Sequence, residues 1–103
     1  MTVYPSPIYV GQFDPLKASD IVDLYLDVAA DLVPGETITA VTFAVTDSDG
    51  ATVAGVVGAH TETDSRTDFR VTAPATTGSY QLAAVFTISD GQRLTKVADF
   101  DVA

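Results

Sequence analysis

The chain has 103 residues and a mass of 10.8 kDa, which suits one domain with its own hydrophobic core and is too short for two. Five basic residues stand against 14 acidic ones, so a net charge of −9 argues against nucleic acid and anionic lipid as partners. Cysteine is absent, which excludes disulfides, thiolate metal sites and thiol nucleophiles.

The composition favours strands over helices. Val, Thr and Ile make up 32 of the 103 residues, whereas the chain has only six Leu and two Glu. Twelve of the 14 acidic residues are Asp, which favours turns and strand ends. No signal peptide and no membrane-spanning segment are expected, because residues 1–7 hold neither a basic residue nor an apolar run, and no stretch approaches about 18 apolar residues.

Residues 1–17 are predicted to form an extended, proline-rich N-terminal arm, and residues 18–103 a single β-sandwich domain. Three prolines in seventeen residues favour an extended backbone. The arm either packs on its own domain or reaches a neighbouring subunit. In the second case its large apolar side chains are the candidate interface residues, namely Tyr4, Ile8, Tyr9 and Phe13.

Residues 19–33 fit two patterns. Four aspartates recur at helical spacing, as do four apolar residues beside them. Val22, Leu24 and Leu26 also alternate with polar residues, which is the period of a strand. The β-rich remainder favours a strand over Ile21–Val28, followed by a helical turn over Ala29–Val33.

The rest of the chain alternates more clearly. The sequence predicts strands over Thr37–Thr46, weakly over Ala51–Val57, over Ser79–Ser89 and over Arg93–Val102, with Phe43, Tyr80 and Phe86 buried. A polar stretch over His60–Thr72 buries Phe69 and Val71, and turns or loops fall at Asp47–Gly50, Pro74–Gly78 and Asp90–Gly91.

About seven short strands with regularly spaced turns predict an all-β fold, an immunoglobulin-like β-sandwich. Tyr80 follows Gly78 and Ser79 at the start of the penultimate strand, where such folds place a tyrosine corner. The chain lacks the Cys and Trp residues of antibody-type cores.

No constellation of residues predicts catalysis, so neither an enzyme nor a cofactor is expected. His60 is the only histidine, and no G-x-S-x-G motif surrounds a serine, so His60 is expected to be solvated. The run Asp47-Ser48-Asp49-Gly50 resembles the opening of a calcium loop but lacks the later ligands, and a plain β-turn, which the same residues favour, is the preferred interpretation. We therefore predict no metal site.

Two stretches suggest a family. Asp20–Asp27 (DIVDLYLD) and Leu32–Ile38 (LVPGETI) resemble the opening of small immunoglobulin-like virion proteins of tailed bacteriophages, of the fibre–tail adaptor type. The apolar strand over Tyr80–Ile88, the Asp-Gly turn and the basic-polar strand over Arg93–Val102 fit the same pattern.

The resemblance implies a non-enzymatic structural protein of the virion, located at the head–tail junction, the tail or the fibre attachment point. Its expected partners are other virion structural proteins, with multiple copies in a symmetric assembly and with neither nucleic acid nor membrane. The alternative is an immunoglobulin-like binding module of a bacterial surface or secreted protein, because function does not follow from fold.

Overall fold

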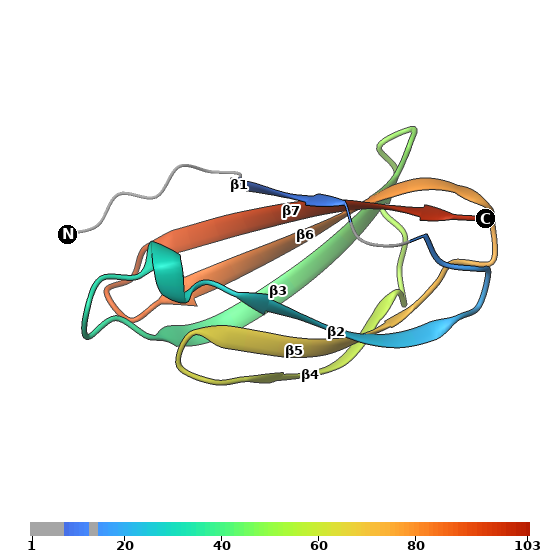
Figure 1. Cartoon of the computed structure of the whole chain (residues 1–103). Coiled ribbons are helices and arrows are strands. Elements are labelled where there is room, and N and C mark those ends of the chain that lie inside the picture. The colour runs from blue at the N-terminus through green and yellow to red at the C-terminus, as the bar shows by residue number, and fades with distance from the viewer. Residues whose placement is uncertain (1–7, 13–14) are drawn as a thin grey trace.

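The structure, a computed structural model, describes residues 8–12 and 15–103, with side chains from residue 15 onwards. Seven strands in this part of the chain form two facing sheets, ordered β1-β7-β6-β3 and β2-β5-β4 (Figure 1). The strands are β1 (Ile8–Gln12), β2 (Ile21–Asp27), β3 (Ile38–Asp47), β4 (Val57–Glu62), β5 (Arg66–Thr72), β6 (Gly78–Ile88) and β7 (Arg93–Val102).

The topology confirms the predicted all-β, immunoglobulin-like sandwich. Strands β2, β5 and β4 occupy the positions of strands B, E and D of an immunoglobulin domain, and β3, β6 and β7 those of C, F and G. These six strands pair in antiparallel fashion, whereas β1 runs parallel to β7 at the edge of the larger sheet.

The ambiguous segment after residue 19 is a strand, as favoured. All seven residues of β2 pair with β5, from Ile21 opposite Thr72 to Asp27 opposite Arg66. A short 3-10 helix, η1 (Ala29–Asp31), follows directly, which confirms the predicted helical turn. The period-2 alternation prevails because it lets one side of β2 pack on the core while the other side faces water.

The core lies between the sheets and is centred on β6. The predicted inward side chains of β6 are all buried: Tyr80, Leu82, Ala84, Phe86 and Ile88. Phe43 was expected to be buried as well, but it is only partly buried. It lies on β3, an edge strand of its sheet, where its ring packs against Phe69, with centroids 4.9 Å apart, and against the exposed ring of His60, with centroids 5.1 Å apart.

Tyr80 forms the predicted tyrosine corner. Its hydroxyl donates a 2.6 Å hydrogen bond to the carbonyl oxygen of Thr76, four residues upstream, and its ring stacks on Phe100 with centroids 5.5 Å apart. The bond ties the loop between β5 and β6 to the start of β6, so it holds one end of the sandwich together.

A lysine also points into the sandwich. Lys96 shares the inward side of β7 with Leu94 and Ala98, and its side chain is only 10% exposed. Its Nζ atom lies 2.6 Å from a carboxylate oxygen of Asp31, in η1. The ion pair therefore anchors the η1 turn to the opposite sheet, which compensates for the charge buried on β7.

The segment over Ala51–Val57 was expected to be a weak strand, and that prediction is wrong. It holds only an isolated bridge between Thr46 and Thr52, and Gly55 has a φ of +77°, which extended strands do not adopt. The strand β4 begins at Val57 instead. The polar stretch that follows is a hairpin of β4 and β5, in which Phe69 and Val71 are buried as predicted.

Part of the N-terminal arm is a strand of the domain. The backbone of β1 pairs with β7 from Ile8 opposite Lys96 to Gln12 opposite Asp99, and Leu16 is buried. This placement agrees with the interpretation in which the arm packs on its own domain. Residues 1–7, 13 and 14, among them Tyr4 and Phe13, lie outside the described part of the chain, and the boundary at residue 17 stays a prediction.

Candidate interaction surfaces

The outward side of the β2-β5-β4 sheet carries the two most exposed large hydrophobic side chains among the described residues. The in–out alternation of β2 turns Ile21 and Tyr25 to solvent, where they are 64% and 60% exposed. We call this surface the Tyr25 face, and it comprises Ile21, Asp23, Tyr25 and Asp27 of β2 with Arg66, Asp68 and Arg70 of β5.

Charged side chains order the Tyr25 face. The guanidinium of Arg66 lies 4.0 Å from the centre of the Tyr25 ring and donates hydrogen bonds of 2.6 and 3.0 Å to Asp68. Arg70 holds Asp23 through two bonds of 2.9 and 3.2 Å. These bonds lower the pKa of Asp23 and raise those of both arginines. The exposed tyrosine therefore sits among side chains whose positions are already set.

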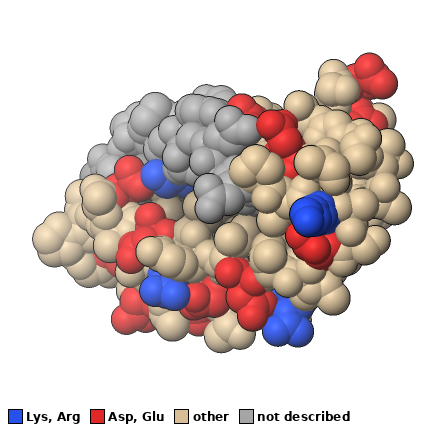
Figure 2. Space-filling view, turned by 45° about the vertical axis from the view of Figure 1, so that its right-hand side comes forward, with Lys and Arg blue, Asp and Glu red and all other residues tan. Residues whose placement is uncertain are grey.

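The Tyr25 face differs from the rest of a strongly acidic molecule. The space-filling view shows acidic side chains spread over the surface, with few basic ones interspersed (Figure 2). Two of the three arginines of the chain lie on this face, so its own charge is close to neutral: three aspartates and two arginines give −1, against −9 for the chain. Another acidic protein is therefore repelled less by this face than by the rest of the surface.

The face is also shallowly hollowed between β2 and β4. Tyr25 and Asp23 line one side of the depression, Ala59 and Thr61 the other, and Arg70 contributes to its lining. Exposed tyrosines and arginines dominate the energetics of many protein interfaces. The arrangement is therefore suited to a protein contact.

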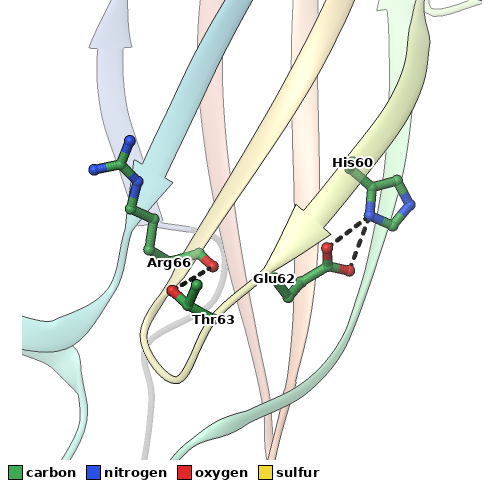
Figure 3. Close-up of polar contacts among 4 residues, drawn as sticks. All are labelled: His60, Glu62, Thr63 and Arg66. Carbon is green, nitrogen blue, oxygen red and sulfur yellow. Dashed lines mark hydrogen bonds and ion pairs between the residues drawn. The ribbon is translucent and has the colours of Figure 1, made fainter.

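His60 is exposed to solvent, as predicted, but its ring has defined partners. It belongs to β4, and its Nδ1 lies 2.9 Å from both carboxylate oxygens of Glu62, while its ring makes an edge-to-face contact with Phe43. His60 and Glu62 project towards β3, whereas the guanidinium of Arg66 projects towards β2, so the β4-β5 hairpin separates the two groups (Figure 3). The ring of His60 is therefore directed away from the charged side chains of the Tyr25 face, although His60 lines part of the hollow between β2 and β4.

The Asp47–Gly50 run adopts a turn. One carboxylate oxygen of Asp47 accepts hydrogen bonds from the backbone N–H groups of Asp49 and Ala51, at 2.9 and 3.0 Å. The turn interpretation accounts for these contacts. Across the described residues, His, Asp and Glu side chains do not gather in threes that could hold a metal ion. No helix in the same part of the chain is long and apolar enough to cross a membrane.

Two of the four predicted interface residues, Ile8 and Tyr9, lie on a different sheet from the Tyr25 face. Ile8 and Tyr9 belong to β1, at the edge of the larger sheet, and nothing in the structure tests their role. The Tyr25 face was not predicted as a site. Its signal was nevertheless present, because Ile21 and Tyr25 are large residues on the polar side of an alternating strand.

Comparison with known proteins places the fold alone. No protein-family model and no curated protein sequence matches the chain. Among solved structures, 95% of the chain superimposes on part of the 2,6-sialyltransferase of Vibrionaceae Photobacterium sp. JT-ISH-224, with a TM-score of 0.57 and 13% identity. That structure is a ternary complex with CMP and lactose, and this chain spans only 18% of the length of the enzyme. At this identity the likeness is one of architecture.

Proposed function

We propose that this protein is a non-enzymatic structural module of a tailed-phage virion, which joins or decorates subunits at the head–tail junction, the tail or the fibre attachment point. One observation carries the proposal. The strand whose sequence resembles those virion proteins, β2, is an edge strand and presents Ile21 and Tyr25 to solvent. Large exposed apolar groups on a sheet face gain free energy when another protein covers them.

The chemistry of the face agrees with a role in assembly. Arg66 and Arg70 are each bound to an aspartate, so they and Tyr25 lose little conformational entropy when a partner docks. The near-neutral charge of the face lets an acidic protein approach other subunits without strong repulsion. A small domain that is repeated many times in one particle needs only such a patch.

The test locates the chain in particles. Phage particles purified from the source culture on a density gradient are probed by immunoblot and immunogold electron microscopy with an antibody against the domain. We expect the 10.8 kDa chain to co-sediment with particles and the gold to mark the tail or its junction with the head. Recovery of the chain only in fractions free of particles contradicts the proposal.

A second candidate is an immunoglobulin-like binding module of a bacterial surface or secreted protein. The likeness to part of a sialyltransferase favours it, because there the same architecture is one piece of a much longer chain. The immunoblot separates the two candidates. A band in the envelope or the medium supports the module, and a band that co-sediments with particles supports the virion protein.

A further inference from the structure

We propose that the Tyr25 face is a contact between copies of this chain, related by a two-fold axis that runs parallel to the strands between β2 and β5. This inference rests on the proposed role in a multi-copy assembly and names the partner of that face. It follows from the order of charges in the β2-β5 register.

In two rows of the β2-β5 register, a row being one residue of β2 and the residue opposite it on β5, an acidic side chain lies opposite a basic one. Asp23 of β2 lies opposite Arg70 of β5, and Asp27 of β2 lies opposite Arg66. In both rows the acid is on β2 and the base is on β5. Side chains that pair directly across two antiparallel strands project on the same side of the sheet, so both rows belong to the exposed surface.

A two-fold axis in the plane between two facing copies, parallel to these strands, places β2 of each copy over β5 of the other. Asp23 then lies over Arg70 of the second copy, and Asp27 lies over Arg66 of the second copy. Each arginine, which is already bound to one carboxylate, gains a second. The contact is isologous, so every such pair occurs twice.

The axis perpendicular to the strands gives the opposite result. It places β2 over β2, with Asp23 above Asp27 of the second copy, and it brings Arg66 and Arg70 together on β5. Like charges in direct contact are strongly unfavourable. The charge pattern therefore selects one orientation.

The middle row supplies the apolar part of the contact. Tyr25 pairs with Asp68 across the strands, so in the chosen orientation it lies over Asp68 of the second copy. Its hydroxyl can donate a hydrogen bond to that carboxylate, and its ring is covered as the two sheets approach. At present Tyr25 is 60% exposed. Covering it provides the hydrophobic gain that charges at the rim of an interface do not.

The area predicts a weak contact. Two strands of seven residues cover roughly 10 Å by 23 Å, or about 230 Å² of sheet, whereas a standard stable interface buries about 800 Å² per partner. We therefore expect a dissociation constant of roughly 0.1–1 mM for isolated copies. In a particle, where other contacts hold copies side by side, a local concentration in the millimolar range is enough to form it.

The test exchanges the charges of one row. The double variant Asp23→Arg with Arg70→Asp keeps the net charge and the bond within the chain. It also keeps the complementarity between two copies of the variant, because each new arginine lies over a new aspartate. A mixed pair of variant and wild type, in contrast, sets arginine over arginine and aspartate over aspartate.

The measurement is a titration of ¹⁵N-labelled protein with unlabelled wild type or double variant at 0.15 M salt, followed by amide chemical shifts. We expect self-association of both proteins with shifts in β2 and β5, and mixed association at least about tenfold weaker. Arg70→Asp alone should weaken self-association by at least about tenfold. The control Arg93→Asp makes the same charge change at an exposed residue of the other sheet. It should change the dissociation constant of self-association by less than about threefold.

Several results overturn the inference. These are wild type that remains monomeric up to 1 mM, a double variant that binds wild type as tightly as itself, or shifts that map outside β2 and β5. Circular dichroism confirms that each variant is folded. Because the assay uses isolated protein, its failure leaves the particle experiment above untouched, and the reverse also holds.

Discussion

Phe86 offers the most direct test of how the two sheets pack. It is fully buried, and its neighbours in the sheet are Val41 on β3 and Leu94 on β7, which are buried in the same cluster. Phe86→Ala removes the whole ring from the buried side of β6, two residues before the end of the strand. Val41 and Leu94, its neighbours on β3 and β7, lose a packing partner at the same time.

The magnitude follows from two contributions. Loss of the buried ring forfeits about 2–3 kcal/mol of transfer free energy, and the cavity left behind adds about 1–2 kcal/mol. The sum of about 4 kcal/mol lies within the range measured for buried Phe→Ala changes. For a domain whose stability is about 5–15 kcal/mol, this loss removes roughly a quarter to four fifths of the stability.

Urea unfolding followed by circular dichroism measures the change, and thermal unfolding should show Tm lower by about 16–30 °C. The matched control is Tyr25→Ala, which removes an aromatic ring from a 60% exposed position on the other sheet and should cost less than about 1 kcal/mol. If Phe86→Ala costs less than about 1 kcal/mol, or no more than Tyr25→Ala, the packing described for β6 is wrong.

Three other predictions concern polar groups. Thr67 is fully buried and its hydroxyl has no hydrogen-bond partner among the described residues, so Thr67→Val should stabilise the protein by about 1 kcal/mol in urea unfolding, and a loss of stability refutes the reasoning. Asp31→Asn leaves Lys96 buried without its carboxylate and should lower the free energy of unfolding by about 2–4 kcal/mol. Lys96→Met should lower it clearly less, because Asp31 is 28% exposed and can be hydrated. Equal losses of stability in the two variants contradict this prediction. Arg70 lowers the pKa of Asp23, so this pair stabilises the fold above the unfolded pKa of about 3.9, and that contribution disappears as the pH falls through the lowered folded pKa. Asp23→Asn should therefore flatten the loss of stability between pH 5 and pH 2, and an unchanged profile argues against the bond.

The larger elements were predictable because their alternation is long. Eleven residues of β6 present one buried side without interruption, and the tyrosine corner follows from the position of Tyr80. The segment after Gly50 was not predictable in the same way. Gly55 interrupts it with a positive φ, and a short polar strand such as β4 carries little apolar alternation to detect.

Contacts between residues that are distant in sequence could not be predicted for a different reason. The alternation of β7 places Lys96 on its buried side, but the carboxylate that compensates for it is 65 residues earlier, in a single turn of 3-10 helix. The Tyr25 face likewise depends on the register between β2 and β5. Shifting that register by one residue turns every side chain to the other side, so the charge rows exist only once the pairing is known.

The parallel pairing of β1 with β7 has a consequence for the order in which the chain folds. Residues 8–12 are synthesised before the other strands of this domain, yet the strand beside them spans Arg93–Val102, so the first strand of the domain can dock only after the last one has been made. The β2-β5 and β3-β6 pairs are also far apart in sequence, and such non-local sheets fold in milliseconds to seconds. During this interval the backbone groups of β1 are available to any exposed strand edge. Docking of β1 on β7 therefore also withdraws the edge of β7 from intermolecular strand pairing.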